Sequence, residues 1–106
     1  MPTSLSLETG RSDQGTPLLK VVGEIDLSNV ESFAHALETA LPEAADATLT
    51  VDLSAVEYLD SAAVNVLFPH AERIRLIAHP FLYRIFGVSG LSELTDVELA
   101  PERHEN

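Results

Sequence analysis

An aspartate and a serine stand where two apolar runs with different periods meet. In VEYLDSAAVNVLF, residues 56–68, the first run stops at Asp60 and Ser61, and the second starts directly after them. An acid followed by a hydroxyl at such a junction suits three roles: a helix N-cap, a nucleophile, or a phosphorylation site. The secondary structure around the two residues is needed to choose among these three roles.

A second acid occupies a similar junction. Asp26 follows one strand-like segment and precedes a helical one, as Asp60 does. If the two strands are neighbours, both carboxylates lie at the same edge of the sheet. Spacing alone favours a pair of acids at helix starts, stabilised by the helix dipole, and leaves a shared functional site as the other interpretation.

The sequence lacks the usual patterns of metal sites and catalytic centres. The four histidines are scattered, no His-Glu-x-x-His occurs, and we interpret them as surface residues: His35, His70, His79 and His104. Ser61 lacks the glycines of a G-x-S-x-G nucleophile elbow, and there is no glycine-rich phosphate loop. We therefore expect no enzyme activity, no catalytic residue, no metal and no cofactor.

Composition indicates one small acidic domain spanning residues 1–106, with residues 101–106 as a frayed tail. The chain has 106 residues, is 45% hydrophobic and carries a formal net charge of −11, which disfavours nucleic acid and anionic membranes as partners. There is no cysteine, no signal-peptide pattern and no apolar run near the roughly 20 residues of a membrane span. We expect a soluble, cytoplasmic monomer.

Periodicity predicts the order β-β-α-β-α-β-α, followed by an edge strand. Alternating apolar residues indicate strands and a 3.6-residue period indicates helices. The expected strands are 3–10, 18–27, 48–56, 73–79 and an edge strand within 94–102, and the expected helices are 28–43, one from 62, and 80–91. This alternation predicts an α/β fold with helices packed on a mixed sheet of four to five strands.

Local signals predict where the helices begin and end. Ser28 and Glu31 form a capping box for the first helix, and Pro42 should end it. Pro69 should shorten or kink the second helix. For the third helix, Pro80 suits the first position and Gly90 suits a left-handed stop, with the apolar Leu91 after it.

Three segments, in the same order along the chain, resemble blocks of the STAS domain, the fold of bacterial anti-sigma factor antagonists. GEIDLSNVESFAHAL resembles its G-E-L-D start. LTVDLSAVEYLDSAAVNVLF resembles its second block, a strand, then D-L-S-x-V-x-x-[LIM]-D-S-[ST]-G-[LIV], then a helix. PFLYRIFGVSGLSEL resembles its closing helix, and together the three blocks cover most of the chain.

This resemblance implies a function in transcription regulation. In such antagonists the serine after the second aspartate is phosphorylated by the partner, an anti-sigma factor that is a serine kinase, and Ser61 matches it. The unphosphorylated antagonist captures the anti-sigma factor and frees the sigma factor, and the phosphorylated form lets go. The residues expected at the partner surface are Glu24, Asp26, Asp60, Ser61, Ala62, Ala63 and Asn65.

Elementary electrostatics is consistent with such a switch. A serine that opens a helix exposes its hydroxyl, and a phosphate there adds about −1.5 to −2 charge. At about 6 Å and an effective dielectric near 20, each charge pair is worth roughly 3 kcal/mol before screening. Part of that energy at a docked interface weakens binding about tenfold or more.

The chain departs from the family pattern after Ser61. Ala62, Ala63 and Val64 replace the second hydroxyl residue, the glycine and the leucine, and alanine favours helix over glycine by about 1 kcal/mol. This predicts a stiffer serine loop, in which Ser61 itself could serve as the helix cap. The segment from Ser61 to Pro80 is shorter than usual by roughly two turns of 3.6 residues, so we expect a stunted second helix or a degraded fourth strand. We also expect no long C-terminal helix, which is usual in the family.

Three functional readings stay open at this point. The first is the phosphorylation-switched antagonist. The second is a STAS accessory subunit, such as one that docks on the ATPase of an ABC-type lipid transport complex, which needs no phosphate at Ser61. The third is a small-molecule or nucleotide sensor, for which the sequence shows no pocket signature.

Overall fold

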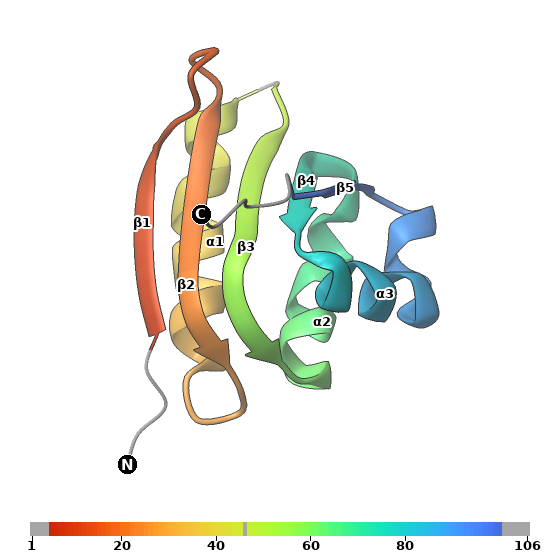
Figure 1. Ribbon diagram of the computed structural model, residues 1–106. Coiled ribbons are helices and arrows are strands. Elements are labelled where there is room, and N and C mark those ends of the chain that lie inside the picture. The colour runs from red at the N-terminus through yellow and green to blue at the C-terminus, as the bar shows by residue number, and fades with distance from the viewer. Residues whose placement is uncertain (1–4, 46, 101–106) are drawn as a thin grey trace, which may run out of the picture.

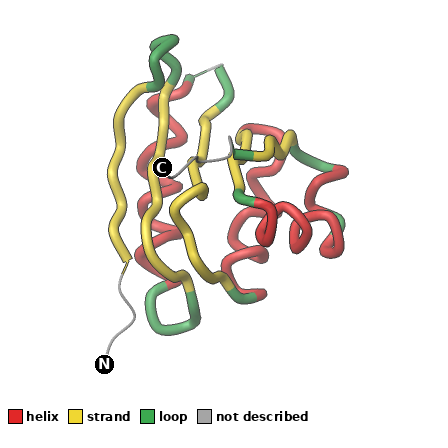
Figure 2. Tube along the Cα trace, in the orientation of Figure 1, coloured by secondary structure: helices red, strands yellow, loops and turns green. Residues whose placement is uncertain are grey.

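The computed structural model describes residues 5–45 and 47–100, and Figures 1 and 2 show their arrangement. The strands are β1 (Leu5–Arg11), β2 (Pro17–Ile25), β3 (Leu49–Leu59), β4 (Ile74–Ala78) and β5 (Asp96–Leu99). The helices are α1 (Val30–Ala44), α2 (Ser61–Leu67) and α3 (Pro80–Ser89), with 3₁₀ turns at Phe68–Arg73 and Leu91–Glu93. The predicted order of elements is confirmed, and the expected tail 101–106 lies outside the described residues.

The five strands form one mixed sheet in the order β1-β2-β3-β4-β5. β1 pairs with β2 antiparallel through a tight hairpin, whereas β2, β3, β4 and β5 pair in parallel. β2 and β3 therefore run in the same direction and end at the same edge (Figure 1). This confirms the expected α/β fold with a mixed sheet.

The core lies between the sheet and the helices. In β2 and β3 the buried residues mostly alternate with exposed ones, so one face of these strands is packed and the other faces solvent. α1 runs behind β1, β2 and β3 in Figure 1 and adds its apolar stripe to this core. Its buried residues are Phe33, Leu37, Ala40, Leu41 and Ala44. Thr50 is an exception to the expected alternation, because it is only 5% exposed.

The predicted capping box at the start of α1 is wrong. The N-cap is Asn29, and the Ser28 hydroxyl donates instead to Asp26 Oδ1, at 2.6 Å. Asn29 Oδ1 accepts from the Asp26 N–H and its Nδ2 donates to the Glu24 carbonyl, both at 2.9 Å. This asparagine bridge fixes the turn after β2, so the helix starts one residue later than the pattern suggested.

The prediction that Pro42 ends α1 is also wrong, because the helix continues to Ala44. A proline removes one backbone hydrogen bond, a small loss this close to a helix end. Leu41 and Ala44 are each 4% exposed. Their burial favours helical backbone through the proline, because a break would turn them away from the sheet.

The predicted shortening occurs in α2 and spares β4. α2 has seven residues, and the chain then continues as a 3₁₀ turn that carries Pro69 near its start. β4 keeps five residues and both of its neighbours. The predicted helix start at Pro80 and the left-handed stop at Gly90, with φ of 87°, are both confirmed.

Candidate functional site

The two acids singled out by spacing lie at one edge of the sheet. Ile25 at the end of β2 pairs with Leu59 at the end of β3. Asp26 and Asp60 directly follow these residues, and the Asp60 N–H donates to the Ile25 carbonyl at 3.2 Å. The expectation that both acids share an edge is therefore confirmed.

Asp60 is the N-cap of α2. Its backbone is extended, with φ of −106° and ψ of −177°, and its Oδ1 accepts a hydrogen bond from the Ala62 N–H at 3.0 Å. Its carbonyl accepts from the Ala63 N–H at 3.1 Å. The aspartate thus satisfies backbone donors that a helix start leaves unpaired. The reading of Ser61 as the cap is wrong.

Ser61 is the first residue of α2 and is exposed. Within residues 5–45 and 47–100, its hydroxyl makes no hydrogen bond. Because Asp60 already caps the helix, the serine has no structural duty that would hold its side chain. The hydroxyl is open to a reagent or a partner protein.

The loop after β2 stands beside this serine and is internally braced. Asp26 Oδ1 accepts from both the N–H and the hydroxyl of Ser28, and Asn29 ties the loop to the end of β2. These bonds hold the loop in one conformation between β2 and α1. The loop and the start of α2 therefore both lie at the end of the sheet where β2 and β3 finish (Figure 1).

The other expected contact residues differ in exposure. Glu24 and Asn65 are exposed and Ala62 is half-buried. Ala63 is fully buried in the core, so its side chain does not reach the surface. The structure does not support Ala63 as a partner contact, because the helical period turns it toward the sheet.

A groove of about 520 Å³ opens beside Ser61, between α2 and α3. Apolar side chains make up most of its lining, and Arg84 and Asp60 supply its charges. The residues that line it are Leu59, Asp60, Ser61, Val64, Asn65, Phe68, Arg84, Ile85, Val88 and Ser89. Val88 is 86% exposed, an unusual state for a large apolar residue. Sequence reasoning missed this groove, because its two walls are far apart along the chain.

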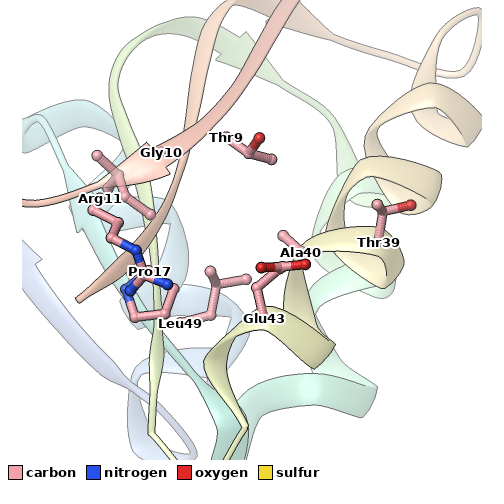
Figure 3. A pocket seen from close by; sticks show the side chains of 9 residues that line it. Thr9, Gly10, Arg11, Pro17, Thr39, Ala40, Glu43 and Leu49 are labelled. Atoms are coloured by element: carbon pink, nitrogen blue, oxygen red, sulfur yellow. The ribbon is translucent and has the colours of Figure 1, made fainter. Parts of the chain in front are cut away.

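A second, smaller hollow of about 260 Å³ lies near the hairpin, between β1, the start of β2 and the later turns of α1. Figure 3 shows the Arg11 side chain on one side of it and the Glu43 side chain on the other. The Arg11 guanidinium donates to the Gly15 carbonyl at 2.9 Å. This hollow is at the opposite end of β2 from Ser61 (Figure 1).

The three histidines that the structure describes, His35, His70 and His79, do not form a cluster of metal-binding side chains. His79 is half-buried, its Nε2 lies 2.6 Å from the Val56 carbonyl, and its ring stacks on Phe81, so it is more enclosed than a surface residue. His104 lies outside the described residues. In the described part of the chain no three metal-binding side chains come together, and none of its helices is long and apolar enough to cross a membrane.

Residues 9–96 match the family model described as "Mlab, STAS domain". The chain belongs to this STAS domain family. The match runs from within β1 to the first residue of β5 and so includes the whole site around Ser61. The resemblance found in the three sequence blocks is confirmed.

Solved structures of this STAS domain's relatives share its fold. A crystal structure of an anti-sigma factor antagonist from Mycobacterium paratuberculosis is 25% identical and covers 90% of this chain and 86% of its own, with a TM-score of 0.79. The anti-sigma factor antagonist SpoIIAA in its unphosphorylated form is 22% identical, with coverages of 92% and 90% and a TM-score of 0.68. The Bacillus SpoIIAA in its phosphorylated form is 20% identical, with coverages of 92% and 93% and a TM-score of 0.63. A search of curated proteins found no match.

Proposed function

We propose that this STAS domain is an anti-sigma factor antagonist that binds an anti-sigma factor of the serine kinase type and is released by phosphorylation of Ser61. The observation that carries the proposal is the separation of roles between Asp60 and Ser61. Asp60 caps α2 through the Ala62 N–H, and the Ser61 hydroxyl next to it is exposed. A kinase can reach this hydroxyl without dismantling the helix.

The similar structures support this role. The M. paratuberculosis protein is an anti-sigma factor antagonist, and SpoIIAA has been solved in both unphosphorylated and phosphorylated forms. A fold of this kind therefore accommodates a phosphate. Our proposal places the corresponding modification of this chain at Ser61.

The partner would dock over the end of the sheet where Ser61 lies. Exposed Glu24 and Asn65, half-buried Asp26 and Asp60, and the open groove surround the serine. In this role the chain is the substrate of the kinase and performs no catalysis itself.

Phosphorylation would act through charge. A phosphate on Ser61 adds about −1.5 to −2 charge directly beside the Asp60 carboxylate. A partner surface that has matched the neutral serine and the acid next to it then faces a dianion, and like charges across an interface cost several kcal/mol. Release follows without any change of fold.

The test compares the wild type with Ser61→Ala, Ser61→Asn and Ser61→Asp. Each protein is immobilised in the host's lysate, retained proteins are identified by mass spectrometry, and the kinase found is purified and titrated. We expect the wild type and Ser61→Ala to bind the kinase alike, and Ser61→Asp to bind about tenfold more weakly or worse. Ser61→Asn is the matched control, because it has the shape of aspartate without its charge and should keep most of the affinity.

Two outcomes would contradict the proposal. If the purified kinase and ATP leave Ser61 unmodified, the switch does not exist even if binding persists. If all four proteins retain a transporter ATPase equally, the chain is an accessory subunit of an ABC-type complex and Ser61 is only a surface residue. Because Ser61 is exposed and unbonded, these substitutions should change the free energy of unfolding by less than about 0.5 kcal/mol, so lost binding cannot be blamed on unfolding.

A further inference from the structure

The groove contains one cationic side chain, Arg84, and no described residue pairs with it. In residues 5–45 and 47–100, the Arg75 side chain is paired with Asp96 and Glu98, Arg73 donates to two carbonyls at the end of α1, and Arg11 donates to Gly15. Arg84 makes no ion pair and no side-chain hydrogen bond with any described residue, and the same holds for Lys20, which is exposed on β2 and does not line the groove. Arg84 is exposed on α3 and lines the groove beside Ser61.

Ser61 and Arg84 line this groove from different elements. Ser61 comes from the start of α2 and Arg84 from the middle of α3. Because both residues line one groove, a phosphoserine on the first helix and an extended arginine on the second can reach toward each other across it.

We propose that Arg84 binds the phosphate on Ser61 and thereby closes the groove. The inference rests on the proposed function, in which a kinase transfers a phosphoryl group from ATP to Ser61 Oγ, with release of ADP and of the hydroxyl proton. The planar guanidinium offers two parallel N–H donors to two phosphate oxygens, the geometry in which arginine and phosphate pair best.

The charges around the groove leave arginine as the group that can hold the phosphate. Asp60 and Arg84 are the charged residues among those that line it, and the Asp60 carboxylate repels a phosphate. The first backbone N–H groups of α2 are largely committed already, because the Ala62 N–H donates to Asp60 Oδ1 and the Ala63 N–H to the Asp60 carbonyl. Arg84 is the cationic side chain in the lining that can supply the attraction.

Binding of the phosphate would also change the shape of the docking surface. In the unmodified protein Val88 is exposed in the lining of the groove, whereas Phe68 and Ile85 are partly buried against the core. An Arg84 side chain drawn across to Ser61 covers part of this lining. Phosphorylation would then remove an apolar docking surface as well as add charge, so release would not depend on repulsion alone.

The experiment installs phosphoserine at position 61 during translation, which needs no kinase, and follows the phosphate by ³¹P NMR across pH. The second pKa of a phosphoserine is ordinarily about 6. Because a nearby cation favours the dianion, we expect this pKa to be about half a unit to one unit lower in the wild type than in Arg84→Gln. Arg84→Lys should lie between them, since lysine keeps the charge and loses the two-pronged contact.

The matched control is Arg11→Gln, which removes the same charge at the hairpin end of the sheet. It should leave the phosphate pKa at the wild-type value. Equal phosphate pKa values in the wild type and Arg84→Gln would overturn the inference. An equal rise in this pKa in Arg11→Gln and Arg84→Gln would overturn it too, because it would indicate only a long-range charge effect. Circular dichroism checks that each variant folds.

The two proposals fail separately. If the kinase does not modify Ser61 but Arg84 lowers the phosphate pKa, the proposed function is wrong and the Arg84 contact exists. If the kinase modifies Ser61 and releases the chain while Arg84→Gln leaves the pKa unchanged, the function stands and the Arg84 contact is wrong.

Discussion

Asp60 and Ser61 are adjacent polar residues of which Asp60 has a structural duty, while the Ser61 hydroxyl has no partner among the described residues. The Asp60 carboxylate accepts a hydrogen bond from the Ala62 N–H, a backbone donor that the helix start would otherwise leave unpaired. The serine follows it at the first helical position, where its own N–H needs no intrahelical partner and its side chain faces outward. A change to the Ser61 hydroxyl should therefore cost the fold little, as the proposed phosphorylation requires.

This division predicts the stability of variants at Asp60. Asp60→Ala removes the cap and should cost about 1 kcal/mol of unfolding free energy, whereas Asp60→Asn keeps a cap oxygen and should cost only a few tenths. Urea unfolding followed by circular dichroism measures both, with the exposed turn residue Asp13→Ala as a control that should be nearly neutral. Equal losses for Asp60→Ala and Asp60→Asn would mean that charge, and not the cap bond, stabilises the helix.

For single residues, the sequence predicts the junctions between strands and helices better than it predicts which side chains reach the surface or the groove. Asp60 and Ser61 were identifiable because a change of hydrophobic period marks the junction between strand and helix. Arg84 was not, because it lies 23 residues further along the chain, and the resemblance of its segment to the closing STAS helix gives this arginine no role. Only the fold shows that it lines the same groove as Ser61. Ala63 was misjudged for a related reason: its position in a motif says nothing of which way its side chain points.

The sequence predicted the presence of the helices more reliably than the residues at which they begin and end. Periodicity gave the interior of α1, but its start was decided by Asn29, which bonds backward to β2 and displaces Ser28 from the cap. Its end was decided by burial beyond Pro42. Both are tertiary effects that override local signals. α3 differs, because Pro80 and Gly90 act through their own backbone geometry and set its ends as predicted.

Two glycines at the end of α3 should respond in opposite directions to alanine. Gly90 has φ of 87°, and although a Cβ there would meet nothing within 4 Å, the left-handed backbone should cost Gly90→Ala about 1–2 kcal/mol. Gly87 is helical and its Cβ would meet only Ser92 Oγ at 4.0 Å, so Gly87→Ala should gain about 0.5–1 kcal/mol. Urea unfolding of both variants tests this. A stable Gly90→Ala protein would show that α3 does not need its left-handed stop.

At the scale of the whole molecule, the sheet brings the site together. Parallel pairing of β2 with β3 places the loop after one strand beside the helix start after the other, and the short α2 leaves α3 near enough to share a groove with it. Alternation of β and α segments predicted this architecture, since few arrangements can bury such patterns. The groove itself depends on the length of α2 and on the packing of α3, which pattern alone does not specify.

Net charge should make stability depend on salt. The chain carries −11, and folding concentrates this charge in a molecule with a radius of gyration of 13.0 Å, which is comparable to the Debye length of about 10 Å at 0.1 M salt. Self-repulsion then opposes folding, and added NaCl weakens it. We expect an increase from 0.01 M to 0.15 M NaCl to stabilise the fold by about 1 kcal/mol, or roughly 4–8 °C in melting temperature.

A charge-reversed variant separates self-repulsion from other effects of salt. Glu38 and Glu72 are exposed on α1 and on the 3₁₀ turn before β4, and neither makes a salt bridge within residues 5–45 and 47–100. Their joint change to lysine lowers the net charge from −11 to −7. The melting temperature of this variant should rise less steeply with NaCl than that of the wild type. If melting temperature rises with NaCl by the same slope in both proteins, the salt effect is not caused by electrostatic self-repulsion. The acidic surface would then not destabilise the folded state.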